Sequence, residues 1–343
     1  MTAESPFDYS GGEAHTDWLA LVTEEAIDPE LPIVDAHHHL WVREPPPYLL
    51  REYLADLNTG HNVVATVYAE CRSMYRLGGP EEMKPVGESE FVAGMAAMSD
   101  SGAFGSTRVC QAMIGWVDVM LGADVGPVLD AHVAASGGRF RGVRVSAAWH
   151  PDETIFSFIE DGDRLTRPEL RAAVAVLGDR DMVLDCWVYH TQLDQLIDLA
   201  DAVPGLTIIA NHTGVPVLAG PYRGRKDDAF ADWRAGMTEL AKRTNVVLKL
   251  GALPLRAKDN ADPTGPPTSD DVAAAWGPWI ETAIQLFGPD RCLFESNFPV
   301  HRRWCSYPVL WNGFKKITAY YSPDERLALF SGTASRVYRL PGG

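Results

Sequence analysis

The sequence of 343 residues lacks the charge pattern of proteins that bind nucleic acids or membranes. It has 30 Lys and Arg residues against 46 Asp and Glu residues, which gives a formal net charge of −16 at pH 7. Nucleic acids and anionic membrane surfaces both demand a basic face. No uninterrupted apolar stretch reaches the roughly 18 residues of a membrane-spanning helix. We therefore expect neither a nucleic acid nor a membrane as a partner.

Cysteine is scarce, and its spacing does not predict a disulfide scaffold. The cysteines are odd in number and form no C-x-x-C pair, as expected of reduced thiols in a cytosolic protein. Residues 1–12 are small and polar rather than basic and then apolar, so no signal peptide is predicted. We therefore expect a cytoplasmic protein. The five cysteines are Cys71, Cys110, Cys186, Cys292 and Cys305.

Motifs of two common kinds of enzyme are also missing. No G-x-S-x-G segment is present to expose a nucleophilic serine. No G-x-G-x-x-G follows the first expected strand, so a nicotinamide or flavin enzyme lacks its phosphate-binding loop. Cys186 and Cys292 lie inside apolar segments, where a neutral buried thiol is the default. Nucleophilic and nucleotide-dependent chemistry are both disfavoured.

Apolar segments of strand length alternate with segments of helical period. Strands are expected at residues 33–38, 63–69, 109–116, 140–145, 182–187, 206–210, 246–250 and 292–295. Helical patterns cover residues 124–135, 167–177, 191–202, 229–243 and 270–287. This alternation is typical of a closed parallel barrel, with a doubly wound open sheet as the alternative. We expect an α/β protein with a single (β/α)8 TIM-type barrel over residues 32–343, preceded by an N-terminal extension over residues 1–31.

The first expected strand leads directly into His37 and His39. In a strand this i, i+2 spacing puts both imidazoles on one face, while His38 points the other way. Two convergent histidines at the carboxyl end of a strand can hold a divalent metal or grip a carbonyl oxygen.

Further polar side chains lie in, or just after, the later expected strands. In (β/α)8 barrels the chemistry sits at the carboxyl ends of the strands. The sequence therefore predicts an active site at this mouth of the barrel. The residues are Glu70, Arg144, His190, Asn211, His212, Lys249, Glu295, Ser296 and Asn297.

Four segments resemble the amidohydrolase-related family, also called the amidohydrolase type 2 group: D-A-H-H-H-L-W (35–41), Y-H-T-Q-L (189–193), N-H-T-G (211–214) and F-E-S-N-F-P-V (294–300). The closing F-S-G-T-A-S-R-V-Y-R-L (330–340) is similar to the family's C-terminal helix. Members include sugar lactonases, pyrone dicarboxylate lactonase and metal-dependent decarboxylases. The resemblance covers residues 33–340, and its first and last strand motifs are the most specific. It implies a (β/α)8 barrel with a mononuclear or metal-free hydrolytic site.

One departure from the family pattern concerns the last strand. Asn297 stands where an S-D-W-P-V-like segment has an aspartate. An amide cannot take a proton, so Asn297 cannot be the general base, although it can orient a water or donate to an oxyanion. Glu295 is equally compatible with a base and with a structural carboxylate paired with Lys249 or Arg144. The candidate bases are Glu295, Glu70, His190 and His212.

The same substitution limits the metal that the site can hold. A binuclear amidohydrolase site needs a bridging lysine carbamate or acid from a middle strand and the aspartate of the eighth strand, and neither is evident. A single Zn²⁺ needs three protein ligands and an open position for water. His37, His39 and either His190 or His212 provide that set. One zinc ion is slightly favoured, and a metal-free mechanism, in which the histidines polarise a carbonyl, stays open.

Aromatic and basic side chains indicate the class of substrate. Residues 71–90, which we interpret as a loop, carry Arg72, and with Arg144 this residue could hold a carboxylate. Glu70 is a further expected contact. Four tryptophans near strand ends either wall the pocket for a ring or apolar group, or pack beneath loops. They are Trp41, Trp116, Trp149 and Trp187.

The sequence therefore predicts a hydrolase that adds water to the carbonyl of a small lactone, ester or amide. The expected substrate is cyclic or aromatic and can carry a carboxylate. A nonoxidative metal-dependent decarboxylase on the same barrel is one alternative. A catalytically inactive binding barrel is another, and Asn297 is the residue that favours it. The expected partner is a small-molecule substrate. The sequence does not fix the oligomeric state and is compatible with a homo-oligomer.

Overall fold

The computed structural model describes residues 13–43, 47–253 and 265–341. Its centre is an eight-stranded sheet in which each strand pairs in parallel with the next along the chain. The strands are β1 (Ile33–His38), β2 (Val63–Ala69), β3 (Arg108–Gly115), β4 (Phe140–Ser146), β5 (Val183–Trp187), β6 (Ile208–Ala210), β7 (Val246–Leu250) and β8 (Cys292–Phe294). Every expected strand is confirmed, and the observed ends lie close to the expected ones.

The segment after the last strand returns to the first strand. A parallel bridge joins His38 to Phe298. His39 N donates to Phe298 O at 2.8 Å, and Asn297 N donates to His37 O at 2.8 Å. These bonds close the sheet at the carboxyl end of β1, where the two histidines lie. The prediction of an α/β TIM-type barrel is confirmed.

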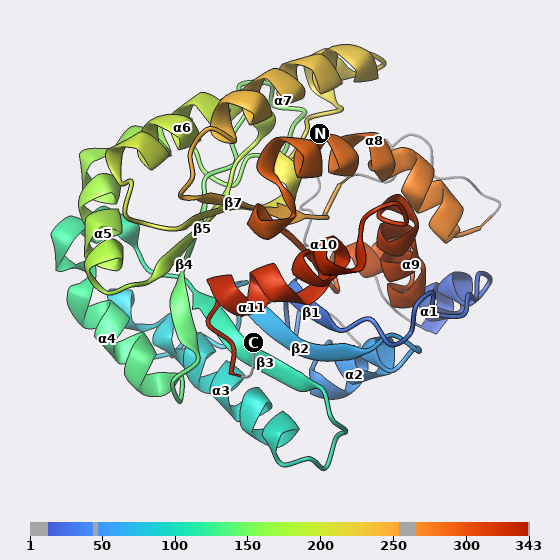
Figure 1. Cartoon of the computed structure of the whole chain (residues 1–343). Helices are drawn as coiled ribbons and strands as arrows, with labels where there is room; N and C mark the ends of the chain where they lie inside the picture. The colour runs from blue at the N-terminus through green and yellow to red at the C-terminus, as the bar shows by residue number, and fades with distance from the viewer. Residues whose placement is uncertain (1–12, 44–46, 254–264, 342–343) are drawn as a thin grey trace.

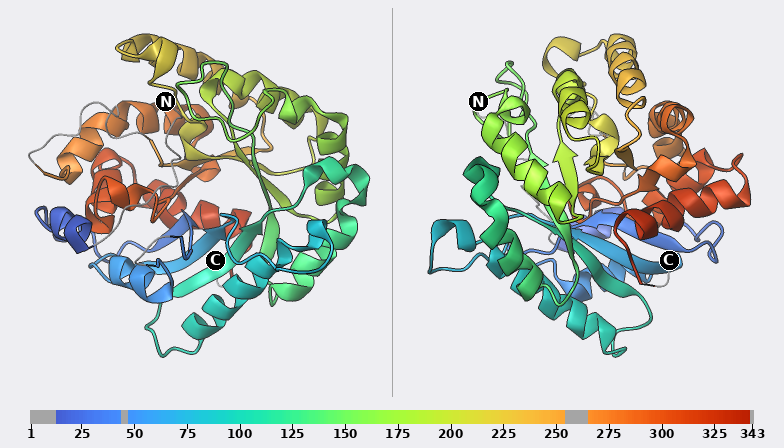
Figure 2. Two further views of the ribbon diagram at one scale, coloured as in Figure 1. Left: turned by 180° about the vertical axis from the view of Figure 1, so that it is seen from behind. Right: turned by 60° about the vertical axis from the view of Figure 1, so that its left-hand side comes forward.

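Helices surround the strands on the outside of the barrel (Figures 1 and 2). The α-helices of the described residues are α1 (Glu13–Leu19), α2 (Leu50–Leu57), α3 (Val86–Asp100), α4 (Gly126–Ala135), α5 (Pro168–Asp179), α6 (Leu193–Ala202), α7 (Lys226–Leu240), α8 (Ser269–Phe287), α9 (Tyr307–Ile317), α10 (Pro323–Leu327) and α11 (Thr333–Val337). Helices α4 to α8 match the expected helical patterns. Within the described part of the chain, no helix combines the length and the apolar character needed to cross a bilayer.

Helix α3 corrects the interpretation of residues 71–90 as one loop, because its first turn lies inside that range. The turn carries Gly87, whose helix propensity is weak, so the sequence gives no clear start signal. The loop before α3 packs on this turn, since a Cβ at position 87 would lie 2.5 Å from Met74 O. Glu88 Oε1 accepts a hydrogen bond from Cys71 N at 2.9 Å. The helix thereby fixes the loop that follows β2.

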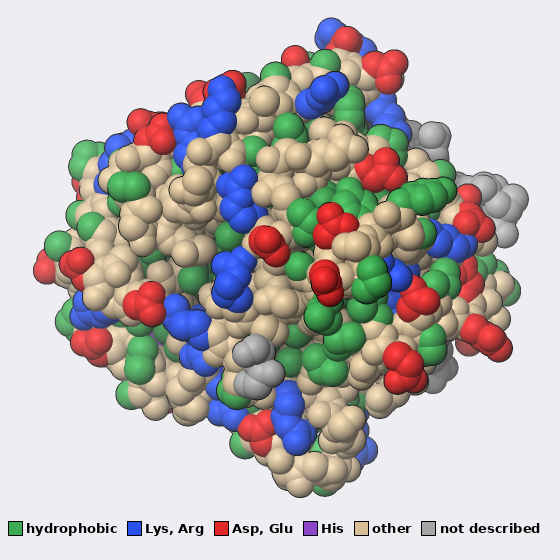
Figure 3. Space-filling view, in the orientation of Figure 1, with side chains coloured by type: hydrophobic (Ala, Val, Ile, Leu, Met, Phe, Trp, Pro, Cys, Tyr) green, Lys and Arg blue, Asp and Glu red, His purple; other side chains and the backbone are tan. Residues whose placement is uncertain are grey.

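The C-terminal helix α11 packs under the barrel, on the side where the strands begin. One cluster of buried apolar side chains joins it to the barrel interior: Val34, Ala36, Ala65, Val67, Ala112, Ile114, Val183, Ile209, Val247, Leu293, Ala334, Val337, Tyr338 and Leu340. Figure 1 shows α11 crossing the barrel close to the C-terminus, and Figure 3 shows Lys and Arg side chains along the middle of the same face. This packing fills the amino end of the barrel.

A cavity of about 250 Å³ lies at this amino end, among residues such as Thr207 and Asn245. Arg291, which lines it, donates to the backbone oxygens of Ala241 at 2.9 Å and Arg243 at 3.0 Å. This arginine therefore binds the loop that leads into β7. Because chemistry in (β/α)8 barrels takes place at the opposite end, we assign this cavity no part in the candidate site.

The segment before β1 packs on helix α9. Asn312 Nδ2 donates to Glu24 Oε2 at 3.0 Å, and Lys315 Nζ donates to Ile27 O at 2.7 Å. Residues 1–12 of the expected N-terminal extension lie outside the described residues. The boundary between extension and barrel at residue 32 stays a prediction.

Candidate functional site

The rings of His37 and His39 lie together at the carboxyl end of β1. Their side chains are almost completely buried, and their ring centroids are 4.8 Å apart. His38 points to the other face of the strand, where its Nε2 lies 2.9 Å from Thr66 Oγ1 and its ring stacks on Tyr53 of α2. The alternation of a β-strand thus separates a pair of histidines inside the barrel from one packed under a helix.

Hydrogen bonds determine which nitrogen of His39 carries its proton. Its Nδ1 lies 2.8 Å from Ala69 O, which can only accept, so Nδ1 is the donor and Nε2 keeps a lone pair. This Nε2 lies 3.3 Å from Nε2 of His37 and 3.2 Å from Oδ1 of Asn297. One polar atom from β1 and one from the residues after β8 therefore lie beside His39 Nε2.

His301 orients the side chain of Asn297. The histidine Nε2 lies 3.2 Å from Leu253 O, so it donates there, and its Nδ1 then accepts from Asn297 Nδ2 at 3.3 Å. Asn297 Oδ1 is consequently directed at His39. Sequence reasoning missed His301, although its place four residues after Asn297 was the available signal.

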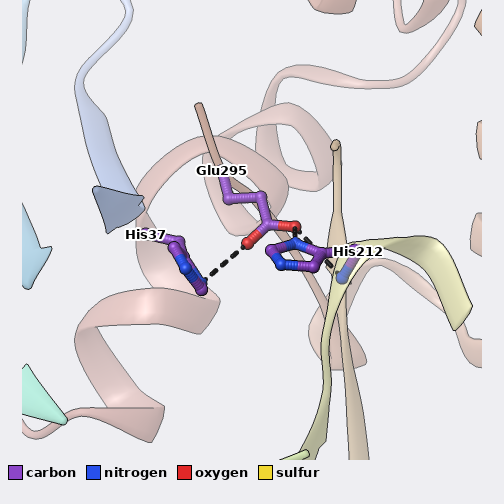
Figure 4. A group of neighbouring side chains, drawn as sticks. All are labelled: His37, His212 and Glu295. Atoms are coloured by element: carbon purple, nitrogen blue, oxygen red, sulfur yellow. Dashed lines mark hydrogen bonds and ion pairs between the residues drawn. The ribbon is translucent and has the colours of Figure 1, made fainter. Parts of the chain in front are cut away.

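Glu295 lies directly after β8 and is completely buried. Its Oε1 accepts from His212 N at 3.1 Å and from His212 Nδ1 at 2.7 Å, and its Oε2 lies 3.2 Å from His37 Nδ1 (Figure 4). Gly251 leaves room for this carboxylate, because a Cβ there would lie 2.8 Å from Glu295 Cγ. Glu295 therefore lies between one histidine of β1 and one that follows β6.

The electrostatics of this cluster favour a carboxylate among neutral imidazoles. Burial alone would raise the pKa of Glu295, but His212, Lys249 and Arg144 together bring it below its ordinary value. Burial, followed by the positive charges of Lys249 and Arg144, holds the pKa of His37 well below 6.5. Burial and Arg144 do the same for His39. These imidazoles are neutral and can act as ligands or proton acceptors at pH 7.

Lys249 of β7 pairs with Asp185 of β5 and not with Glu295, which was one of the pairings considered from the sequence. Its Nζ lies 2.5 Å from Asp185 Oδ2 and 3.1 Å from His37 Nδ1. Tyr338, which follows α11, donates to Asp185 Oδ1 at 3.2 Å. Asp185 is a residue that sequence reasoning missed, because it lies within an apolar strand and not at its end.

Arg144 of β4 connects the buried cluster to a cavity. Its Nη2 lies 3.4 Å from His212 Nε2, and its Nη1 donates to Glu70 O at 3.3 Å and lies 3.8 Å from Glu70 Oε1. The cavity has a volume of about 260 Å³ and contains three arginines against one carboxylate. Its lining residues are Arg43, Glu70, Cys71, Arg72, Arg144, Phe156 and Phe158.

The aromatic wall of this cavity consists of phenylalanines. The guanidinium of Arg72 lies 4.6 Å from the ring centre of Phe158. Trp187 packs edge-on against Phe158 and His212, with ring centroids 5.4 and 6.0 Å apart. Trp187 therefore lies between the cavity and the histidine cluster.

The other expected tryptophans are placed differently. Trp41 stacks on His39 with a centroid distance of 5.6 Å. Trp116 packs near Tyr75, and Trp149 packs over Gly162. None of these three tryptophans is among the described residues that line the cavity.

His190 is directed away from the other histidines. Its Nδ1 accepts from Val217 N at 3.1 Å, and its ring packs edge-on against Tyr222. No contact between described residues joins it to His37 or His39. His212, the other candidate of the sequence analysis, is the histidine that the fold places beside His37, at a centroid distance of 4.9 Å.

Two overlapping sets of donor atoms suit a metal ion. His37, His212 and Glu295 each offer one ligand atom, and these atoms lie within 4.8 Å of one another. In the second set, the Nε2 atoms of His37 and His39 are 3.3 Å apart, and Asn297 Oδ1 is the third donor. Nitrogens bound to tetrahedral zinc at ~2.0–2.1 Å are about 3.3–3.4 Å apart. The second set fits this spacing, whereas Nδ1 of His212 is already bonded to Glu295.

Comparisons with known proteins identify the family of this barrel. The amidohydrolase family model matches residues 34–340. The uncharacterized protein y4mH of Sinorhizobium fredii is 31% identical over 91% of this chain and 99% of its own length. An L-fucono-1,5-lactonase of Burkholderia multivorans is 28% identical over 90% of this chain and 96% of its own length. A crystal structure of an amidohydrolase from Burkholderia multivorans with bound zinc has a TM-score of 0.69 and 25% identity, covering 90% of this chain and 99% of that one.

The family match covers nearly all of the barrel, from β1 to the residues after α11. Its ends coincide with the strand that carries His37 and with the helix that packs under the barrel. The chain therefore belongs to the amidohydrolase family and is a hydrolase.

Proposed function

We propose that this protein hydrolyses a small lactone that carries a carboxylate. The observation that carries the proposal is the position of Arg144, which lines an arginine-rich cavity and also contacts His212. A charged substrate group held in the cavity would place the rest of the molecule beside the histidine cluster. The lactonase relative described above supports ring opening as the reaction.

The cavity suits an anion despite the acidic protein around it. Arg43, Arg72 and Arg144 outnumber the single carboxylate of Glu70. Guanidinium groups bind carboxylates in a bidentate, charge-assisted geometry. Phe156 and Phe158 provide an apolar surface for the ring.

The pair of His212 and Glu295 provides a general base. His212 donates its Nδ1 proton to Glu295 and keeps a lone pair on Nε2, the atom that faces Arg144 at the cavity edge. We infer that Nε2 takes a proton from the attacking water and that Glu295 stabilises the imidazolium that forms. The arrangement has the same logic as a histidine and carboxylate in a catalytic triad.

The side of the site away from His212 binds the carbonyl oxygen of the lactone. His37, His39 and Asn297 would hold one zinc ion, which would supply a Lewis acid for the carbonyl and a bound water. Without zinc, an N–H group of the same residues can donate to the oxygen as charge develops there. Asn297 lacks the carboxylate of the family pattern, so we assign the base to the pair of His212 and Glu295.

The experiment compares lactones that carry a ring carboxylate with the same lactones as neutral methyl esters. We expect acid release and ring opening for the carboxylated compounds, and a KM raised about 10- to 100-fold in Arg72→Gln, as for loss of a charge-assisted contact. Arg108→Gln is the control, because Arg108 is exposed and faces Asp100 outside the cavity. Equal use of neutral and carboxylated lactones by the wild type would contradict the anionic substrate. CO₂ evolved in step with substrate loss would instead favour the decarboxylase.

A further inference from the structure

Nδ1 of His37 lies between a hydrogen-bond donor and an acceptor. Lys249 Nζ is 3.1 Å away, and Glu295 Oε2 is 3.2 Å away. All three side chains are completely buried, so water does not compete for these contacts. A neutral imidazole carries one proton, so Nδ1 either accepts from Lys249 or donates to Glu295. The structure has Glu295 Oε2 without a hydrogen-bond partner among the described residues, which favours the contact with Lys249.

The protonation of His37 Nδ1 determines whether Nε2 of the same ring donates a hydrogen bond or presents a lone pair. When Nδ1 accepts from Lys249, the proton is on Nε2 and can be donated to His39 Nε2, 3.3 Å away. When Nδ1 donates to Glu295, both Nε2 atoms present lone pairs, which is the form that a metal needs. The change moves one proton from Nε2 to Nδ1 and leaves the net charge of the site unaltered.

Contacts on several sides fix the orientation of the Lys249 side chain. Asp185 Oδ2 lies 2.5 Å from its Nζ, and the ring centre of Tyr338 lies 5.5 Å from it. Tyr338 also donates to Asp185 Oδ1. The residues after α11 therefore support the lysine from the amino end of the barrel.

We propose that Lys249 is a positioning residue that opposes zinc binding by holding His37 in the Nε2–H tautomer, and that Glu295 favours zinc by accepting the proton of Nδ1. The balance between these two residues sets the zinc affinity of the site. This inference rests on the proposed function only in taking His37 and His39 as the zinc ligands. It adds a residue to the site that the family motifs do not contain.

The first test measures the tautomer of His37 in zinc-free protein by ¹⁵N NMR of histidine-labelled samples, with the signal assigned by its loss in His37→Gln. We expect an Nε2–H tautomer in the wild type and an Nδ1–H tautomer in Lys249→Met. An Nδ1–H tautomer in the wild type overturns the proposal without reference to any variant. The same tautomer in both proteins also overturns it.

The second test is a double-mutant cycle read out as zinc affinity by chelator competition. We expect Lys249→Met to tighten zinc binding about tenfold, the size of one net hydrogen bond. Glu295→Gln should weaken binding roughly 10- to 100-fold, as for loss of a partner of a metal-bound histidine. In the Glu295→Gln background, Lys249→Met should tighten binding again, because the lysine holds Nδ1 as an acceptor whether or not a carboxylate competes with it.

Arg144→Met is the matched control, because it also removes a positive charge near His37 but does not contact Nδ1. Tightening of the same size in Arg144→Met would show a general charge effect, and a zinc affinity unchanged by Lys249→Met in both backgrounds would remove the lysine from the site. Either result overturns the proposal. Lys249→Met leaves Asp185 buried without its cation, so the cycle is repeated in Lys249→Met/Asp185→Asn, which removes both charges. Neither test uses a substrate, so failure of the proposed lactone chemistry leaves both results interpretable.

Discussion

Oδ1 of Asn297 lies 3.2 Å from Nε2 of His39, and His301 fixes the amide in the orientation that makes this contact. An asparagine therefore occupies the position at which the family pattern has a carboxylate. Its oxygen is directed at the histidine pair, whereas the carboxylate beside His37 and His212 belongs to Glu295, two residues earlier. The separation of these two roles gives the first prediction.

Asn297→Ala should lower turnover by roughly 10²–10³, the effect of removing one preorganised polar group that acts on developing charge. The KM for a carboxylated lactone should change little, because Asn297 is not among the residues that line the arginine-rich cavity. Initial rates over a substrate series measure both constants. The control is Asn62→Ala, since the side-chain amide of Asn62 is exposed and donates to Glu30 O. Full turnover in Asn297→Ala would remove Asn297 from the mechanism.

A second prediction concerns the glycine beside the carboxylate. Gly251 has a φ of 153°, and a Cβ there would lie 2.5 Å from Glu295 O and 2.8 Å from Glu295 Cγ. Gly251→Ala should displace Glu295 and lower both activity and the free energy of unfolding, because the contact involves backbone that cannot move aside. Gly205→Ala is the control, since a Cβ at 205 meets nothing within 4 Å. Equal rates and unfolding midpoints in both variants would refute the steric argument.

The frame of the site could be predicted from the sequence because it depends on local patterns. The alternation of β1 separates His38 from His37 and His39 within three residues. The rule that polar residues gather at the carboxyl ends of strands was sufficient to select Arg144, His212 and Glu295. These inferences need only the strand boundaries, and apolar segments mark those boundaries well.

The partners of these residues could not be predicted, because they depend on which side chains from non-adjacent strands meet inside the barrel. Asp185 and Lys249 come from strands that are not neighbours in the sheet, and no local pattern pairs them. His190 and His212 look alike in sequence, since each follows a strand. Only the conformation of the backbone after each strand distinguishes the two histidines. It directs His190 towards Val217 N.

The third prediction tests whether His190 lies outside the zinc site, as the structure places it. His39→Gln should remove a bound zinc ion, whereas His190→Gln should retain it, because His190 has its own contacts outside the cluster. Elemental analysis of protein purified without chelator should give at most about one equivalent of zinc in the wild type and in His190→Gln, as for a single closed set of ligands. Loss of zinc in His190→Gln would restore the ligand set expected from the sequence. Two tightly held equivalents would refute the single site.

A fourth prediction concerns stability at low pH. Burial and then Lys315 lower the pKa of His61 from 6.5 to about 4. The unfolded chain therefore binds a proton before the folded protein does, and the stability present above pH 6.5 is lost as the pH falls from 6.5 to about 4. Urea unfolding at pH 7 and pH 5 should show a smaller loss in His61→Gln than in the wild type. An equal loss in both proteins would assign the effect to other groups.

The last prediction gives the sign of two shifts in the pH–rate profile. Burial lowers the pKa of His212, Glu295 opposes this effect, and Arg144 and Lys249 add to it. Glu295→Gln removes the opposing charge, so the pKa of His212 should fall further and the acidic limb of kcat/KM should move to lower pH. Turnover should fall at the same time, because the imidazolium that forms has lost its carboxylate.

Arg144→Met should move the same limb in the opposite direction, because it removes a positive charge that lowers the pKa of His212. Profiles measured with a neutral lactone separate this effect from the binding of a substrate carboxylate. If His212 is the base, the two variants shift the limb in opposite directions while the wild type lies between them. Shifts in one direction, or an unchanged limb in Glu295→Gln, would transfer the role of base to Glu70, the buried carboxylate that lines the cavity.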